Sequence, residues 1–87
     1  MARRSHLVRM RIATVLNETN GWMTCNEITE RFLDEGWSFT SAYQLGRLCS
    51  NTIGITSRID NNGNRYYKIE NLTSFHHWMK QEPVYGN

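Results

Sequence analysis

The side chains best suited to reading a ligand lie on one face of a helix that we predict between about residues 40 and 52. Arg can bridge guanine and Gln can pair with adenine at the base edges of the DNA major groove. Arg47 and Gln44 share this face with Tyr43, and the face carries no acidic side chain, which a solubilising face would usually have. Short hydroxyl side chains nearby can donate to phosphates. The residues of this segment predicted to contact nucleic acid are Thr40, Ser41, Tyr43, Gln44, Arg47 and Ser50.

A second basic set lies in the stretch GITSRIDNNGNRYYKI, residues 54–69, which has the pattern of two strands joined by a tight turn. Cations on both arms and an Asn-rich tip suit contacts with a phosphate backbone, and basic N-terminal arms often add further phosphate contacts. The alternative interpretation of both sets is a solvated helix face and an ordinary soluble hairpin. The predicted backbone contacts are Arg58, Asn61, Asn62, Asn64, Arg65 and Lys68 in the hairpin, and Arg3, Arg4 and Arg9 in the arm.

The residue pattern gives little support to metal binding or catalysis. His76 and His77 are adjacent, so on a helix they point about 100° apart and cannot chelate one ion together. The acidic residues have no His or nucleophile at matching spacing, so we predict no enzyme. Cys25 and Cys49 have no CxxC pattern and no His at ligand spacing, which favours reduced, small apolar core residues over a disulfide or a metal site. No cofactor, metal or catalytic residue is predicted.

Charge is segregated along the chain, although the net charge is only +2. Residues 1–11 carry four Arg and no acid, residues 12–37 have a net charge of −4, and residues 38–69 have a net charge of +3. Such asymmetry indicates a directed electrostatic face, and the acidic side chains must point away from any bound phosphate. No apolar run approaches the ~20 residues of a membrane span, and no apolar region of a signal peptide follows the first residues. We therefore expect a cytoplasmic protein without a membrane partner.

Apolar spacing and cap residues predict four helices. Residues 5–18 form the first helix, with Ser5 as its N-cap and an apolar stripe. Thr24 and Glu27 form a capping box, so the next helix starts at Cys25 and closes at Gly36. Trp22 and Met23, just before it, can form a short strand or a hydrophobic staple. The apolar stripe of the first helix is Val8, Ile12, Val15 and Leu16. Ser38 or Thr40 caps the third helix, whose buried residues are Ala42, Leu45, Leu48 and Cys49. Asn71 or Thr73 caps a short last helix that runs through residue 80.

Two registers are possible for the hairpin. A two-residue Asn62-Gly63 loop pairs Ile59 with Tyr66, whereas a three-residue loop with Gly63 in the left-handed conformation pairs Ser57 with Tyr67. A shift of one residue moves every side chain to the other face, so the apolar pattern favours the three-residue loop. In that register the inward residues are Ile55, Ile59, Tyr67 and Ile69, and the outward residues are Thr56, Arg58, Tyr66 and Lys68, which we expect on the side where the third helix shows Arg47.

The element order, with MTCNEITERFLDEGWSFTSAYQLGRLCSN followed by ITSRIDNNGNRYYKI, resembles the winged helix-turn-helix family over about residues 7 to 69. The pattern T-x-x-E-I, a short turn and S-A-x-x-L-x-x-L looks like the helix-turn-helix core, and the hairpin looks like the wing. The turn DEGWSFT departs from the family, because it carries acid and a large aromatic. The resemblance implies that the helix near residues 40–52 enters the major groove and that the wing reaches backbone or minor groove.

The predicted fold is α+β: a small winged-helix domain with a three-helix core, a two- to three-stranded wing and a short C-terminal helix. Its boundaries are a flexible basic arm at residues 1–6, the domain at 7–80 and a flexible tail at 81–87. The predicted function is sequence-specific binding of double-stranded DNA in transcriptional regulation, and the alternative is a protein-docking module that does not bind DNA. A homodimer is expected through the terminal helices, with Leu7, Met10, Phe75, Trp78 and Met79 as its surface.

Overall fold

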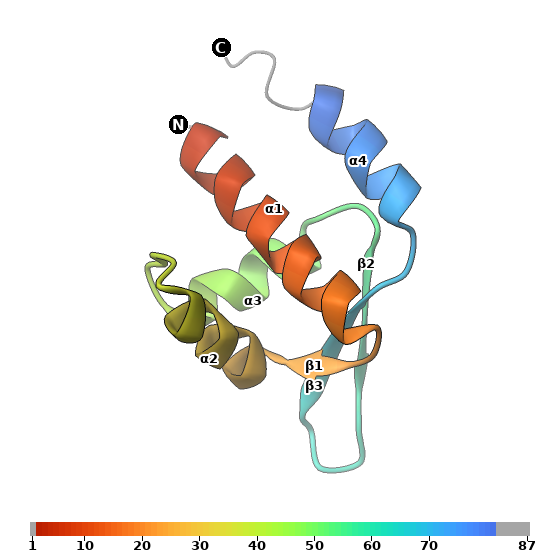
Figure 1. Cartoon of the computed structure of the whole chain (residues 1–87). Helices are drawn as coiled ribbons and strands as arrows, with labels where there is room; N and C mark the ends of the chain where they lie inside the picture. Colours follow the sequence, from red (N-terminus) through yellow and green to blue (C-terminus); the bar gives the residue numbers. More distant parts are fainter. Residues whose placement is uncertain (1, 82–87) are drawn as a thin grey trace.

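Four helices and a three-stranded antiparallel sheet follow one another in the predicted order in the computed structural model, which describes the backbone of residues 2–81 and the side chains of residues 6–80 (Figure 1). The predicted α+β class is confirmed, and the arrangement is compatible with a small winged-helix-like domain. The predicted tail, apart from residue 81, lies outside the described residues. The elements are α1 (Ala2–Thr19), β1 (Met23–Thr24), α2 (Cys25–Glu35), α3 (Ala42–Ser50), β2 (Ile55–Ile59), β3 (Arg65–Ile69) and α4 (Leu72–Gln81).

Helix α1 begins three residues before its predicted start. The prediction that Ser5 caps the helix is wrong, because α1 already runs from Ala2. The backbone of residues 2–6, predicted to be a flexible arm, is therefore helical. Ala and Arg are among the best helix formers, and the segment contains no Gly or Pro that would stop the helix.

Helix α2 is bounded by the capping groups that the sequence predicts. The backbone N–H of Glu27 donates to Thr24 Oγ1 at 3.2 Å, and the backbone N–H of Thr24 donates to Glu27 Oε1 at 2.9 Å. Gly36 ends the helix in the left-handed conformation, with φ of 76°. Both capping motifs satisfy backbone groups that a helix end would otherwise leave unpaired.

The core lies between the first three helices and one face of the sheet. All four predicted apolar positions of α1 are buried, and they pack with Phe32 and Tyr67 in one cluster. The Phe32 ring is packed edge to face by Trp37 and Phe39, with ring centroids 5.3 and 5.8 Å away. These two aromatics belong to the turn between α2 and α3, so the aromatic character of that turn serves the core.

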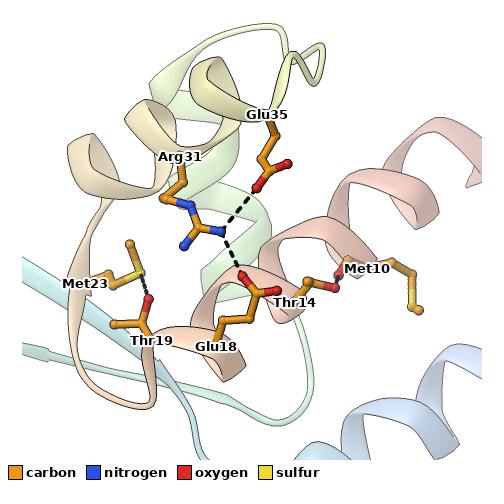
Figure 2. Close-up of polar contacts among 7 residues, drawn as sticks. All are labelled: Met10, Thr14, Glu18, Thr19, Met23, Arg31 and Glu35. Atoms are coloured by element: carbon orange, nitrogen blue, oxygen red, sulfur yellow. Dashed lines mark hydrogen bonds and ion pairs between the residues drawn. The ribbon is translucent and has the colours of Figure 1, made fainter.

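Arg31 joins the C-terminal ends of α1 and α2 (Figure 2). Its Nη2 atom lies 2.8 Å from Glu18 Oε1 and 3.4 Å from Glu35 Oε2. Both carboxylates raise the pKa of Arg31, Glu18 most strongly through its hydrogen bond. Nearby, the Thr19 hydroxyl donates to the sulfur of Met23 at 3.2 Å, which ties the end of α1 to β1. The ion pairs are exposed, so they orient the two helices more than they stabilise them.

The hairpin has the three-residue register that the apolar pattern favours. Ser57 lies opposite Tyr67, and β1 pairs with the other edge of β3 to give the strand order β1-β3-β2. Gly63 has φ of 86°, as the three-residue loop requires. Asp60 organises the tip, because its Oδ1 accepts from the backbone N–H groups of Asn62 at 2.8 Å and Asn64 at 2.9 Å. These hydrogen bonds, that of Asn64 foremost, lower the pKa of Asp60 and keep it ionised at neutral pH.

The prediction for one inward residue of the hairpin is wrong. Ile59 was expected to face the core, but its side chain is 55% exposed. Tyr67 is buried, and Ile55 and Ile69 are half-buried against the same cluster, so the faces are assigned correctly. Ile59 stands at the end of β2 near the tip, where the hairpin extends beyond the helices (Figure 1). The described residues therefore leave more than half of its surface uncovered.

Helix α4 lies beside α1 (Figure 1) and closes a second, smaller core. Asn71 is its N-cap, because the backbone N–H of Ser74 donates to Asn71 Oδ1 at 2.9 Å. Phe75 and Met79 are buried with Ala13 of α1. Among the described residues, no helix has the length and apolar character that crossing a membrane requires.

Candidate nucleic-acid interface

Helix α3 presents a polar face that has no acidic side chain. Its N-cap is Ser41, whose Oγ accepts from the backbone N–H of Gln44 at 3.1 Å, so the prediction of Ser38 or Thr40 as the cap is wrong. The helix ends at Ser50, two residues before its predicted end. Leu45, Leu48 and Cys49 are buried, as predicted, but Ala42, expected to be buried with them, is only half-buried. The other side chains of the helix therefore face outward: Tyr43, Arg47 and Ser50 are exposed, and Gln44 is half-buried.

Tyr43 and Arg47 form a pair on this face. Tyr43 is 75% exposed, although its ring is apolar. The guanidinium carbon of Arg47 lies 6.0 Å from the centroid of the Tyr43 ring, at the outer limit of a cation–π contact. A contact of this length leaves the guanidinium donors available to an incoming base edge or phosphate.

A groove of about 440 Å³, the α3–wing groove, runs between α3 and the sheet. Tyr67 forms its floor, and burial raises the pKa of Tyr67, while a hydrogen bond with Ser50 opposes that rise. None of the described residues that line the groove is acidic. Its lining is Cys25, Ala42, Tyr43, Gly46, Arg47, Ser50, Asn51 and Tyr67.

Gly46 sets the depth of the α3–wing groove, and replacing it by Ala gives the first prediction. A Cβ atom at this position would lie 3.5 Å from the Tyr67 hydroxyl and 3.6 Å from Cys25 Sγ, which are ordinary van der Waals distances. Ala is a better helix former than Gly by about 0.8–1 kcal/mol. We expect Gly46→Ala to raise the free energy of unfolding by up to about 1 kcal/mol in urea titrations.

The matched change Gly46→Val tests the closeness of that contact. A branched side chain must push against Tyr67 or Cys25, so this variant is expected to lose stability where Ala gains it. Equal stability of the Ala and Val variants would contradict the close approach of α3 to Tyr67.

A second groove of about 500 Å³, the α1–α3 groove, opens at the N-terminal end of α3. Arg11 lies there, with its guanidinium carbon 5.1 Å from the centroid of the Trp37 ring. The residues predicted from sequence to contact nucleic acid do not include Arg11, although it lies in the basic N-terminal segment, one helical turn after Leu7. The lining residues are Leu7, Val8, Arg11, Ser38, Phe39, Thr40 and Gln44, none of them acidic.

Arg9 does not belong to a flexible arm. Its Nε donates to Thr52 Oγ1 at 3.2 Å, and its guanidinium carbon lies 5.2 Å from the centroid of the Trp78 ring. Arg9 therefore links α1 to the segment after α3 and to α4. The side chains of Arg3 and Arg4 lie outside the described residues.

The wing cations divide between the two faces of the sheet. Tyr67 faces the core and the α3–wing groove, and side chains alternate along a strand, so Arg58 and Lys68 project from the opposite face. There the Arg58 guanidinium lies 5.0 Å from the Trp22 ring and 5.2 Å from the Tyr66 ring, and Lys68 Nζ lies 5.7 Å from Trp22. The expectation that these outward residues share a side with Arg47 is therefore wrong.

Arg65 is the wing cation on the α3 side. It lies on the same sheet face as Tyr67, and its Nη1 donates to Ser57 Oγ at 3.4 Å. Asn61, Asn62 and Asn64 are exposed at the tip. The structure thus places Arg65 on the sheet face that carries Tyr67 and adds Arg11 at the N-terminal end of α3, while Arg58 and Lys68 lie on the opposite sheet face.

The acidic side chains of α2 point elsewhere. Glu27, Glu30 and Asp34 line a groove of about 280 Å³ beside Trp22 and the end of α1. This groove shares no described lining residue with the two grooves that flank α3. Phosphate bound along α3 would therefore meet Arg and hydroxyl side chains, and the acids of α2 would be on another side.

The two cysteines are free thiols. Cys49 is buried in the core, and burial raises its pKa to about 12. Cys25 donates through Sγ to the carbonyl oxygen of Ala42 at 2.8 Å, and burial raises its pKa as well. The described side chains contain no group of three His, Cys, Asp or Glu that could hold a metal ion.

Comparisons of the chain with protein-family models, curated proteins and solved structures find no match. The function must therefore be inferred from the geometry of α3 and its two flanking grooves.

Proposed function

We propose that this chain binds double-stranded DNA, with α3 in the major groove, and acts as a transcriptional regulator in the cytoplasm. The observation that carries the proposal is the exposed face of α3, which has Arg and amide donors and no acid, between two grooves whose described lining residues include no acid. Nine residues make α3 about 13 Å long, and the major groove is about 12 Å wide and admits one helix.

In this arrangement Arg47 and Gln44 are placed to read base edges. Arg11 lies at the N-terminal end of α3 and Arg65 lies on the sheet face that carries Tyr67, so in the proposed complex both would meet phosphates on either side of the helix. Thr40, Ser41 and Ser50 add short hydroxyl groups along the helix. The Asn residues of the wing tip, with Arg58 and Lys68 on the far face, would reach backbone only along the outside of the wing.

Binding of generic duplex DNA tests the proposal most directly. We expect the chain to retard duplex DNA at low salt and to lose affinity steeply as salt rises, because phosphate contacts release counterions. In an NMR titration with the duplex, amide shifts should be confined to residues 40–51, with Arg11 and the residues around Arg65. If no duplex binds at low salt, the proposal is wrong.

A protein-docking function is the second candidate, and one observation favours it. Trp22, Arg58 and Tyr66 cluster on the far face of the sheet, and these three residue types are enriched in the hot spots of protein interfaces. Shifts confined to this face in the presence of a cell extract fraction, with none on α3 in the presence of DNA, would favour docking.

The dimer surface predicted on the terminal helices is used in part within the chain, while Leu7 is exposed and Met10 is half-buried. Phe75 and Met79 are buried against α1, and Trp78 is covered in part by Arg9. Leu7 stays 49% exposed, but it lies at the α1–α3 groove. Two of the predicted dimer residues, Phe75 and Met79, therefore cannot contact a second copy while α4 stays on α1.

A further inference from the structure

Strand β2 is an open edge of the sheet. The strand order is β1-β3-β2, so among residues 2–81 the five-residue strand β2, like the two-residue β1 at the other edge, has a neighbour on one side only. Its hydrogen-bonded pairs with β3 fall on even-numbered residues, as the bonds from Asp60 N to Asn64 O and from Glu70 N to Gly54 O show. In an antiparallel pair the intervening residues direct their backbone groups away from the partner. The N–H and C=O groups of Ser57 and Ile59 therefore point outward, where another strand can pair with them.

The side chains of β2 match an antiparallel copy of the same strand. Its sequence, Ile-Thr-Ser-Arg-Ile, has the same residue at both ends and Ser57 at its centre. When two copies pair about Ser57, Ile59 of each copy lies opposite Ile55 of the other. Apolar cross-strand pairs stabilise a sheet, and this pairing covers Ile59, which is 55% exposed without any contact that explains it.

The charges on β2 permit this register. Arg58 of one copy lies opposite Thr56 of the other, so no two cations face each other directly. The Arg58 guanidinium also leans over Trp22 and Tyr66, back across its own sheet and away from the open edge. The remaining like charges are the two Arg65 side chains, which reach toward Ser57 on the α3 side. An anion bound between them would offset their repulsion.

We propose that β2 pairs edge to edge with β2 of a second copy of this chain, in antiparallel register centred on Ser57. Antiparallel neighbours are related by a two-fold axis perpendicular to the sheet, so both copies keep the same sheet face on the same side. The two α3 helices then lie on one side of a continuous sheet, together with both Arg65 side chains. This last consequence rests on the proposed function, because the anion between the arginines would be a DNA phosphate; the strand pairing does not.

A cysteine placed at the axis tests the register in the full chain. In Ser57→Cys the two new thiols lie opposite each other in a hydrogen-bonded pair, about 5.5 Å apart at Cα, which suits a disulfide. We expect mild oxidation to give a disulfide-linked dimer on a non-reducing gel. The matched control is Thr56→Cys. Its two cysteines would be diagonal neighbours across the strand pair, about 7–8 Å or more apart, which is too far for a disulfide. Equal cross-linking of the two variants, or none of Ser57→Cys, overturns the register.

A substitution at an exposed apolar residue tests the interface without threatening the fold. Ile59→Asp should raise the dissociation constant of the dimer about tenfold or more in sedimentation experiments, because both Ile55–Ile59 pairs are lost. The matched control Leu33→Asp changes another exposed apolar residue, on α2, and should leave self-association unchanged. If Leu33→Asp weakens self-association and Ile59→Asp does not, the edge pairing is wrong. Cross-linking of Ser57→Cys without any DNA binding would leave the pairing in place and remove the proposed function.

Discussion

The variant Gly54→Ala is expected to lose about 2–5 kcal/mol of stability, a large part of the ~5–15 kcal/mol of a small domain. Gly54 has φ of 98°, where a side chain costs roughly 1–2 kcal/mol. Its Cβ would also lie 2.7 Å from the carbonyl oxygen of Asn71 and 2.9 Å from Cβ of Phe75. Neither atom can yield easily, because one is backbone and the other belongs to a buried residue at the start of α4.

Gly63→Ala is the matched control, and urea unfolding followed by circular dichroism is the measurement. Gly63 also has positive φ, 86°, but nothing lies within 4 Å of the position of its Cβ. Its replacement should therefore cost only the strain of the left-handed conformation, roughly 1–2 kcal/mol. Equal losses in the two variants would mean that α4 does not pack on Gly54 as closely as described.

The large effect at Gly54 reflects its position between two parts of the fold. Its carbonyl oxygen accepts from the backbone N–H of Glu70 at 2.7 Å and from that of Asn71 at 3.2 Å. The same residue therefore lies directly before β2 and holds the segment that leads from β3 into α4. A side chain at Gly54 disturbs the wing and the second core together.

A further prediction concerns function: Arg47→Ala should weaken binding to duplex DNA by about 10- to 100-fold at constant salt. Arg47 is exposed on α3, so its truncation should leave the fold and the melting temperature nearly unchanged. Its guanidinium is held near Tyr43 beside the α3–wing groove, where it faces a bound duplex in the proposed arrangement.

Two further variants separate a base contact from loss of charge. Lys80→Ala removes one positive charge from the exposed end of α4 and should change affinity little. Arg47→Lys keeps the charge but loses the planar pair of donors that matches guanine, so it should reduce discrimination between sequences more than it reduces general affinity. Fluorescence anisotropy with labelled duplexes over a range of salt measures both quantities. If Arg47→Ala and Lys80→Ala have equal effects, α3 is not the recognition helix.

Local sequence signals predict the parts of the fold that depend on neighbouring residues. The capping box at Thr24 and Glu27 marks the start of α2, and the apolar alternation selects the three-residue loop at Gly63. The start of α1 and the cap of α3 are harder to predict, because several adjacent residues can cap a helix or continue it. Ser38, Thr40 and Ser41 all have suitable hydroxyl groups, and the packing of Phe39 on Phe32 decides among them.

The candidate site is predictable only as far as each element alone defines it. A period of 3.6 residues places Tyr43, Gln44 and Arg47 on the outer face of α3. A period of two separates Arg58 from Arg65 in the wing, but no local pattern tells which sheet face meets α3. The burial of Tyr67 beside α3 decides this, and such a contact joins residues distant in the chain. The contribution of Arg11 is hidden for the same reason, since Trp37 holds it near α3 only in the folded chain.

The residues of α3 that pack in the core differ from those that are exposed, which has a consequence for how this protein can evolve. Leu45, Leu48 and Cys49 anchor the helix in the core, and the exposed Tyr43, Arg47 and Ser50 contribute little to that anchoring. Substitutions at the exposed positions should therefore be nearly neutral for folding, while each one alters the surface that a ligand meets. If α3 binds DNA as proposed, a lineage of such chains can change its target in a few mutational steps without passing through unfolded intermediates.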